Sequence, residues 1–257
     1  MRLSDTDVGE TLADICEAAA ALILPLWRSG LTVHSKADES PVTEADRRGE
    51  TLILERLAAA FPDVPVVSEE DSSEFGTPEA IGPVFFLVDP LDGTKAFVRG
   101  DPNFTVNIAL VADGRPVAGA VSAPPTGETW FTKAGGTLKR VNGGATKPVH
   151  VRPWNPATAL GLISHTATDE QVRRLTEEYG FARTEAMDSS IKLCRIAEGA
   201  ADIYPRHGPT MEWDIAAAHA VLEGAGGRLE TPDGQPFVYG KADKGFRNGW
   251  FVARGGR

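Results

Sequence analysis

The sequence has few cysteines and no long basic run, and each shortage excludes a class of protein. Its two cysteines, Cys16 and Cys194, lie far apart and in no metal-ligand spacing, so a disulfide framework is not expected. Both fall in apolar helical patterns, which predicts buried thiols. The formal net charge is −10, so the charge does not favour non-specific binding to nucleic acid or to a membrane surface. An anionic substrate would need cations brought to it.

Long hydrophobic runs are also missing. The apolar stretch from Ala18 to Trp27 is shorter than the roughly 20 residues that cross a bilayer. The residues from Met1 to Asp5 lead into an acidic amphipathic helix rather than forming a signal peptide. We therefore predict no integral membrane segment and a cytoplasmic location.

The overall composition is typical of a folded protein: of the 257 residues, 42% are hydrophobic and 24% are charged. The length allows one large domain or two modest ones. Up to about residue 150, helical patterns are followed by strand patterns, with a hairpin signal at Asp113-Gly114. After Pro153 strands and helices alternate, which is typical of an α/β unit. We predict an α+β half over residues 1–153 and an α/β half over residues 154–257.

The individual elements follow from hydrophobic periodicity and from turn residues. The first helix is expected to be capped by Asp5 and to end at Gly30. The predicted helices cover residues 8–26, 169–179 and 189–198. Another helix is opened by residues 40–43 and stopped by Pro62, and a last one begins near residue 214. The predicted extended segments cover residues 31–34, 65–68, 84–89, 105–112, 116–122, 160–164, 181–185 and 202–204, with more strand around Trp130 and a turn at Gly135-Gly136.

Two carboxylates are concentrated where one buried strand ends. Asp89 closes the apolar run of residues 84–88, so it lies at the carboxyl end of a strand, where open α/β sheets tend to bind ligands. Pro90 stiffens the turn, Asp92 adds a second carboxylate and Gly93 allows close backbone approach. Such a turn can share hard cations, and its exposed amides can receive phosphate oxygens. An ordinary acidic turn is the alternative interpretation.

Carboxylates at the ends of other elements favour a functional site. Glu69 and Glu70 follow the strand that ends at Ser68, and Asp214 lies near the amino end of an alanine-rich helix. Taken separately, Asp214 would be a helix cap and the two glutamates a solvated pair. The scattered histidines show no zinc pattern, whereas ligands that offer only oxygen suit magnesium.

The motifs, taken in order, resemble the inositol monophosphatase superfamily over nearly the whole chain. The first signature is Asp89-Pro90-Leu91-Asp92-Gly93-Thr94, and the segment from Trp213 to Ala218, running to Gly226-Gly227, is similar to the second. Segments 41–46 and 68–70 fall in the expected order. The resemblance implies an α+β / α/β fold, a layered α-β-α-β-α sandwich of the sugar-phosphatase type, and a metal-dependent phosphomonoesterase. Such motifs are hypotheses about structural context.

The resemblance also implies a role for each site residue. Magnesium, two or three ions in all, is expected on Glu69, Asp89, Asp92, Asp214 and the carbonyl of Leu91. The attacking water is expected to be oriented and activated by Asp46, Thr94 and Glu69, and the phosphate to be received by the amides of Gly93 and Thr94. Asp46 alone would be interpreted as a helix-start residue. Without cations these carboxylates would repel one another, since two unit charges 4 Å apart cost roughly 4 kcal/mol at an effective dielectric near 20. Magnesium reverses that sign and lowers the pKa of a bound water.

Later segments resemble the 3′(2′),5′-bisphosphate nucleotidase branch, namely residues 95–97, 103–110, 189–194, 197–199 and 204–214. The resemblance implies hydrolysis of adenosine 3′,5′-bisphosphate to AMP and phosphate, a place in sulfate assimilation and inhibition by lithium. The second phosphate needs cations, for which Lys95, Lys192 and Arg206 are the candidates, although each alone would be a surface charge.

Four residues of this branch region depart from the branch pattern or have more than one interpretation. Ala96 stands where the branch often has glutamate, and Asp188 where a glycine commonly precedes the serines. The first departure lies at the rim near the substrate, so it bears on specificity rather than on the chemistry, and no role is predicted for Asp188. Tyr204 is predicted to pack, and for His207 a surface or core role is favoured over a role in the pocket.

Two alternatives stay open beside the nucleotidase. Within the same chemistry, the chain would be an inositol monophosphatase or a histidinol-phosphate phosphatase. In another class of protein, it would be a non-catalytic sensor that binds magnesium and nucleotide. The complete set of predicted acidic metal ligands argues against such a sensor. In each case the partner is a small phosphorylated molecule and not a nucleic acid. The oligomeric state is open, with a homodimer as one alternative.

Overall fold

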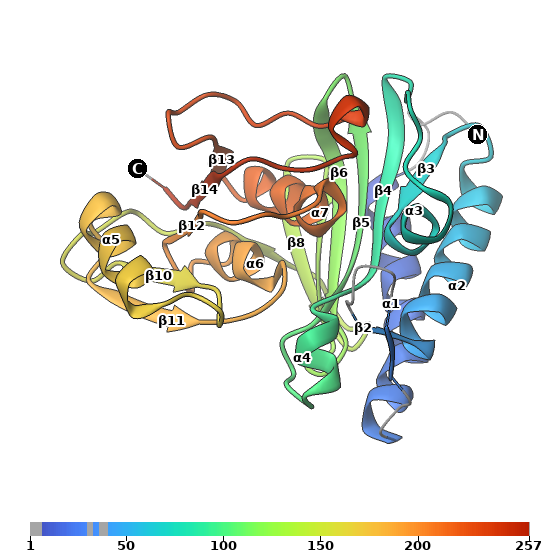
Figure 1. Ribbon diagram of the computed structural model, residues 1–257, viewed down its shortest axis with the longest axis horizontal. Coiled ribbons are helices and arrows are strands. Elements are labelled where there is room, and N and C mark those ends of the chain that lie inside the picture. The colour runs from blue at the N-terminus through green and yellow to red at the C-terminus, as the bar shows by residue number, and fades with distance from the viewer. Residues whose placement is uncertain (1–6, 30–32, 36–40, 257) are drawn as a thin grey trace.

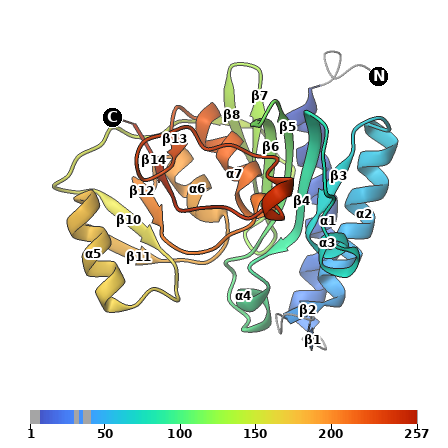
Figure 2. The same ribbon diagram turned by 45° about the horizontal axis from the view of Figure 1, so that its top comes forward.

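The computed structural model describes residues 7–29, 33–35 and 41–256, which form alternating layers of helix and sheet (Figure 1). Helices α1 (Val8–Ser29) and α2 (Glu44–Ala60) cover one face of a seven-stranded sheet. Helices α6 (Ile191–Ala197) and α7 (Glu212–Gly224) lie between this sheet and a five-stranded sheet (Figure 2). Helix α5 (Asp169–Tyr179) covers the outer face of the second sheet. The predicted α-β-α-β-α sandwich is confirmed.

The first sheet is antiparallel except at one edge. Its strands follow chain order, and only β3 and β4 run parallel. The strands are β3 (Val66–Ser68), β4 (Val84–Asp92), β5 (Thr105–Ala112), β6 (Arg115–Ala123), β7 (Glu128–Lys133), β8 (Gly136–Val141) and β9 (Lys147–Val149).

The second sheet has the order β11-β10-β12-β14-β13. Strand β10 runs parallel to both neighbours, whereas the remaining pairs are antiparallel. The strands are β10 (Leu160–Ile163), β11 (Arg183–Ala186), β12 (Ile203–Arg206), β13 (Arg228–Glu230) and β14 (Phe251–Arg254). The short elements outside the two sheets are β1 (Val33–Ser35), β2 (Pro41–Thr43), α3 (Glu69–Phe75), α4 (Thr94–Val98) and the 3₁₀ helix η2 (Ala242–Lys244).

Strand β4 shows why its apolar run is continuous. Phe86 and Val88 pack toward α1 and α2, whereas Phe85 and Leu87 pack toward α6 and α7. Because successive side chains of a strand point to opposite faces, a strand covered on both faces needs an apolar residue at every position. The strand that carries the acidic turn is therefore held between two cores.

The two halves predicted from the sequence share one of these cores. The first sheet comes from residues 66–149 and the second from residues 160–254. The core between the sheets joins Phe85 and Trp130 of the first half to Leu193, Trp213 and Phe251 of the second. The division at residue 153 stays a prediction.

Several predicted elements are confirmed in detail. Helix α5 has the predicted bounds, and Thr168 and Gln171 form a reciprocal capping box at its start. Asp113 and Gly114 both have positive φ, at 50° and 75°, as a two-residue hairpin turn requires. Gly135 lies in the turn between β7 and β8.

Other elements differ from the prediction. Strand β4 continues past Asp89 to Asp92, with a register shift between those residues. Pro90 has no N–H for the ladder, yet its backbone can remain extended. Helices α3 and α4 and strands β13 and β14 were not predicted, since segments of three to seven residues are too short for periodicity to identify.

Both cysteines are free and buried, as predicted. Burial raises the pKa of each thiol well above its usual value, which keeps both protonated. Asp5, Gly30 and the start of the predicted extended segment 31–34 lie outside the described residues. Within the described ranges, no helix is long and apolar enough to cross a membrane.

Candidate active site

Three carboxylates from distant parts of the chain meet at one point. The carboxylates of Glu69, Asp89 and Asp214 each have an oxygen within 4.8 Å of the others. The parallel register pairs Ser68 with Val88, so Glu69, the first residue of α3, lies beside Asp89 in the next strand. Asp214 reaches the same point from the first turn of α7, where its Oδ2 accepts a 2.7 Å hydrogen bond from the Met211 amide. The structure thus brings together three of the predicted metal ligands.

Burial and the neighbouring charges of this acidic cluster raise the pKa values of Asp89 and Asp214. Burial raises the pKa of Asp89 well above its usual value, and the charges of Glu69, Asp92 and Asp214 raise it further. Burial likewise raises the pKa of Asp214, and the charges of Asp92 and Glu69 raise it further. A bound divalent cation would offset both burial and repulsion, and a cluster of oxygen ligands alone suits a hard cation such as Mg²⁺. The residues present therefore fit the metal that the sequence motifs imply.

Asp92, the second carboxylate of the turn, faces the carboxyl-terminal half of the chain. Its Oδ2 accepts a hydrogen bond from the backbone amide of Ser190. Burial raises the pKa of Asp92 to about 6, although the nearby Lys192 ammonium and the Ser190 amide act to lower it. The Ser190 hydroxyl in turn donates to Asn107 Oδ1 over 2.8 Å. These contacts connect the acidic turn to the start of α6.

The turn itself is held by one carboxylate and one glycine. The Leu91 amide donates to Asp89 Oδ1 over 2.9 Å. Gly93 has φ 95°, and a Cβ at this position would lie 2.9 Å from the carbonyl oxygen of Asn103. Any other residue would meet both backbone strain and this close contact. The turn can therefore approach a ligand closely.

Thr94 and Asp46 form the predicted pair. The Thr94 hydroxyl lies 3.2 Å from Asp46 Oδ1 and 3.1 Å from the carbonyl oxygen of Leu91. Asp46 is 1% exposed and lies in the first turn of α2. Since both neighbours are acceptors, the hydroxyl hydrogen serves one of them and the oxygen lone pairs remain open to another donor.

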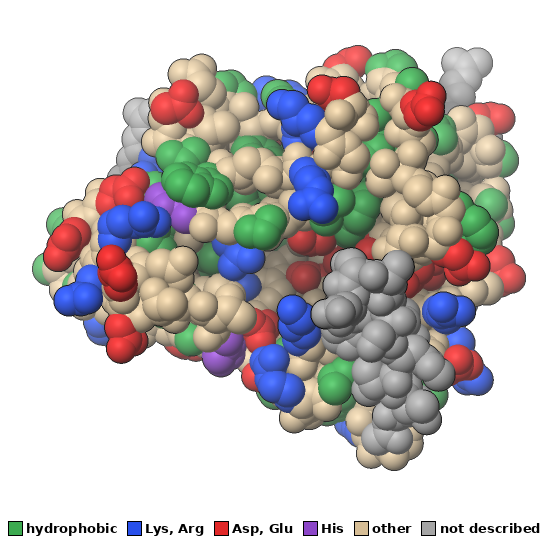
Figure 3. All heavy atoms as spheres, in the orientation of Figure 1, with side chains coloured by type: hydrophobic (Ala, Val, Ile, Leu, Met, Phe, Trp, Pro, Cys, Tyr) green, Lys and Arg blue, Asp and Glu red, His purple; other side chains and the backbone are tan. Residues whose placement is uncertain are grey.

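A cleft of about 530 Å³ is lined by the site residues Glu69, Asp89, Asp92, Thr94 and Asp214. Figure 3 shows a hollow with acidic side chains on its floor and Lys or Arg side chains around it. The cationic residues that line the cleft are Lys95, Lys192, Arg206 and Arg247. An anionic ligand would therefore find cations at the cleft of a protein whose net charge is negative.

The cationic side chains of the cleft differ in their hydrogen-bond partners within the protein. Lys192 is 4% exposed, and its ammonium donates to the carbonyls of Met187 and Ser189 over 3.0 and 2.6 Å. Burial lowers its pKa to about 8. Arg206 donates to the carbonyl of Pro209 over 3.2 Å, and its buried Nε has no partner among the described residues. Direct contact of either residue with substrate stays a prediction.

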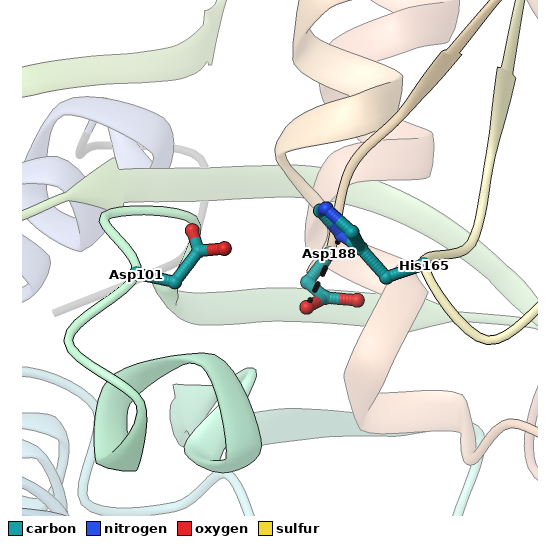
Figure 4. A group of neighbouring side chains, drawn as sticks. All are labelled: Asp101, His165 and Asp188. Carbon is teal, nitrogen blue, oxygen red and sulfur yellow. Dashed lines mark ion pairs between the residues drawn. The ribbon is translucent and has the colours of Figure 1, made fainter.

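Loops from both halves of the chain meet at the rim of the cleft. His165 Nδ1 lies 3.4 Å from Asp188 Oδ2, and Figure 4 shows Asp101 across from this pair. Arg99 forms a 2.7 Å ion pair with the same Asp188 carboxylate. Asp188, for which the sequence suggested no role, therefore joins the loop after α4 to the loop before α6.

His207 and Tyr204 lie next to a smaller cavity of about 250 Å³ beside the cleft. His207 stacks on Trp250 with ring centres 4.6 Å apart, and its Nε2 lies 3.0 Å from the Tyr179 hydroxyl. Tyr204 is buried and packs edge-on against Phe251, in agreement with the predicted packing role.

Sequence reasoning missed two features of the site. Arg247 lines the cleft, although an isolated arginine in a loop carries no local signal. The contact of Ser190 with Asp92 was also missed, although the pair Ser189-Ser190 had been noted as a motif. The signal that pointed to those serines was the resemblance of residues 189–194 to the nucleotidase branch.

Comparison with known proteins gives the family. The chain matches the model of the inositol monophosphatase family over residues 5–250. It is 41% identical over 209 residues to the 3′(2′),5′-bisphosphate nucleotidase CysQ of Escherichia coli (strain K12), covering 81% of this chain and 83% of that protein. It is 33% identical over 247 residues to the protein of the same name from Buchnera aphidicola, covering 95% and 92%.

Solved structures agree with this result. CysQ from Bacteroides thetaiotaomicron, a bacterial member of the inositol monophosphatase family, superposes with a TM-score of 0.77 at 30% identity, over 96% of this chain and 97% of that one. An inositol monophosphatase from Zymomonas mobilis gives a TM-score of 0.78 at 26% identity, over 100% and 95%. The family predicted from the motifs is confirmed: the chain belongs to the inositol monophosphatase family and is an enzyme of that family.

Proposed function

We propose that this enzyme hydrolyses adenosine 3′,5′-bisphosphate to AMP and phosphate, with Mg²⁺ as cofactor. The observation that carries the proposal is the convergence of Glu69, Asp89 and Asp214 in a cleft lined by cationic side chains. The named relatives, at 33–41% identity, are 3′(2′),5′-bisphosphate nucleotidases, which supports the choice of substrate.

The metal is assigned to the acidic residues around the turn. Glu69, Asp89, Asp92, the Leu91 carbonyl and Asp214 would hold two or three Mg²⁺ ions. Bound there, Mg²⁺ would lower the pKa of water and stabilise negative charge on the phosphoryl oxygens. The burial of Asp89 and the raised pKa values of Asp89 and Asp214 support a site that needs a cation at neutral pH.

The protein's own groups would orient the nucleophile and the phosphate. Thr94 donates its hydrogen to Asp46 and accepts a hydrogen bond from the attacking water, so the water's lone pair points at phosphorus. Glu69, whose carboxylate lies within 4.8 Å of those of Asp89 and Asp214, would complete the catalytic set with Thr94 and Asp46. The Gly93 and Thr94 amides would receive the oxygens of the reacting phosphate. Lys95, Lys192 and Arg206 are the candidates for the second phosphate, because charge-assisted donors bind phosphate oxygens best.

A substrate panel tests the proposal. Purified protein is assayed with Mg²⁺ on adenosine 3′,5′-bisphosphate, inositol 1-phosphate and histidinol phosphate, and phosphate release is measured. We expect the highest kcat/KM on the bisphosphate and no turnover after chelation of the metal. A preference for inositol 1-phosphate or histidinol phosphate would transfer the assignment to that substrate. Binding of nucleotide with no turnover on any substrate would support a sensor.

Three further properties belong to the same proposal. A role in sulfate assimilation follows from the substrate, and inhibition by lithium follows from the family resemblance. The cytoplasmic location is the one predicted from the sequence. Undiminished activity in millimolar lithium would count against the close kinship.

A further inference from the structure

Residues 239–248, here named the C-terminal strap, are hydrogen-bonded to the start of α7. The carboxylate of Glu212, which is 0% exposed, accepts hydrogen bonds from the amides of Gly240 and Lys241 over 2.7 and 3.0 Å and pairs with the Lys241 ammonium over 2.7 Å. The Glu212 amide donates to the carbonyl of Phe246 over 2.9 Å. The Asn248 side chain donates to the Met211 carbonyl over 2.7 Å. The strap is thus fixed to the turn of helix that carries Asp214.

Arg247 lies at the part of the strap that reaches the cleft. Its neighbour Phe246 is fully buried, with ring centres 6.4 Å from Phe85 and 6.3 Å from Trp213. The backbone of Arg247 forms a β-bridge with Met211. The main chain of Arg247 is therefore held firmly beside the acidic cluster, while its side chain is exposed and lines the cleft.

The guanidinium of Arg247 differs from the charged groups of Lys192 and Arg206 in being uncommitted. Among the described residues, none forms an ion pair or a side-chain hydrogen bond with it. Lys192 is buried and bonded to two carbonyls, and Arg206 is bonded to Pro209. Within the part of the chain that the structure describes, the Lys95 ammonium is likewise uncommitted, but it directly follows Thr94 in the turn whose amides would receive the reacting phosphate. A second anionic group of the substrate would thus find Arg247 available.

We propose that Arg247 is a specificity residue, which binds the phosphate of the substrate that is not cleaved. Its planar guanidinium can donate two parallel hydrogen bonds to a phosphate, which a lysine cannot. This inference rests on the proposed function, because only a bisphosphorylated substrate offers a second phosphate. Arg247 acts on substrate binding and leaves the step at the metal site to other residues.

The test compares Arg247→Gln with the matched control Lys244→Gln. Lys244 is an exposed cation of the same strap and does not line the cleft, so both variants change the net charge equally. On adenosine 3′,5′-bisphosphate we expect Arg247→Gln to raise KM about tenfold to a hundredfold with kcat within about twofold, since a charged hydrogen bond is lost. Lys244→Gln should leave both constants unchanged. Arg247→Lys should recover part of the loss.

A substrate with one phosphate separates this inference from the proposed function. On inositol 1-phosphate or on adenosine 3′-monophosphate, Arg247→Gln should act like the unmodified enzyme. Equal KM values of Arg247→Gln and Lys244→Gln on the bisphosphate would overturn the role of Arg247 while leaving the nucleotidase intact. If the unmodified enzyme shows no preference for the bisphosphate over the single-phosphate substrates, the proposed function fails, and the role of Arg247 with it.

Discussion

The two walls of the cleft are built differently. The wall with the acidic cluster comes from regular elements: Asp89 from a strand buried on both faces, Glu69 from the residue after a strand paired with it, and Asp214 from the first turn of a buried helix. The other wall comes mainly from loops, which carry Asp188 and Arg247, while Arg206 lies at the end of strand β12. Rigid elements hold the groups that must meet at fixed distances, whereas loops supply the groups that select a substrate.

The largest effect is expected from the rigid wall. Asp89→Asn should lower kcat/KM about a thousandfold or more, because a metal ion contributes several kcal/mol of transition-state stabilisation. The melting temperature in EDTA should stay equal or rise, since the change removes one buried charge from a repelling cluster. The exposed Asp63→Asn is the matched control and should leave both quantities unchanged. Retained turnover in Asp89→Asn would contradict the metal assignment.

The next largest effect is expected from Thr94, which is proposed to orient the attacking water. Thr94→Val removes the hydroxyl between Asp46 and the Leu91 carbonyl with little change of volume. We expect kcat to fall about a hundredfold, the size of a lost general-base contribution, with KM nearly unchanged. Thr94→Ser keeps the hydroxyl and should retain most of kcat. Steady-state kinetics on the bisphosphate measure both, and a loss in KM alone would assign Thr94 to binding.

The pH dependence of stability tests the acidic wall of the cleft without a mutation. A carboxyl whose pKa is raised in the folded state, such as Asp92 at about 6 against 3.8, keeps its proton longer than in the unfolded chain. Its contribution to the stability of the metal-free protein is therefore present below pH 3.8 and is lost as pH rises to 6. For Asp92 the change is on the order of 3 kcal/mol, and Asp89 and Asp214 act in the same direction.

Magnesium should cancel this loss. The difference in melting temperature between Mg²⁺ and EDTA is expected to grow from pH 4.5 to pH 8, because the ligands must be deprotonated to bind the metal. Thermal scans at a series of pH values measure it. A difference that stays constant over this range would show that the acidic cluster is not the metal site.

The smallest effect is expected where the two walls join. Ser190→Ala removes the hydroxyl bonded to Asn107, while the backbone amide that binds Asp92 remains. The free energy of unfolding should fall by about 1–3 kcal/mol, because buried polar groups lose a partner. We expect kcat/KM to change less than tenfold. A loss as large as that of Asp89→Asn would assign the hydroxyl a direct part in the reaction.

The two walls also differ in how far the sequence predicts them. The turn of Asp89 and Asp92 was predicted because a continuous apolar run, a proline and a glycine carry local meaning. The layered fold followed from the order of the motifs. Arg247 and the strap could not be predicted, because their place depends on hydrogen bonds of Glu212 and Asn248 to distant backbone. Nor could the burial of Lys192, since nothing local distinguishes a buried lysine from an exposed one.

Diffraction from crystals soaked in Mn²⁺, a close analogue of Mg²⁺ with an anomalous signal, would examine the acidic cluster itself. We predict anomalous peaks bound by the carboxylates of Glu69, Asp89 and Asp214, with at least one peak lost in Asp89→Asn. The absence of any peak at these three side chains, or an Asp214 carboxylate turned away from Asp89, would contradict the proposed metal-dependent mechanism.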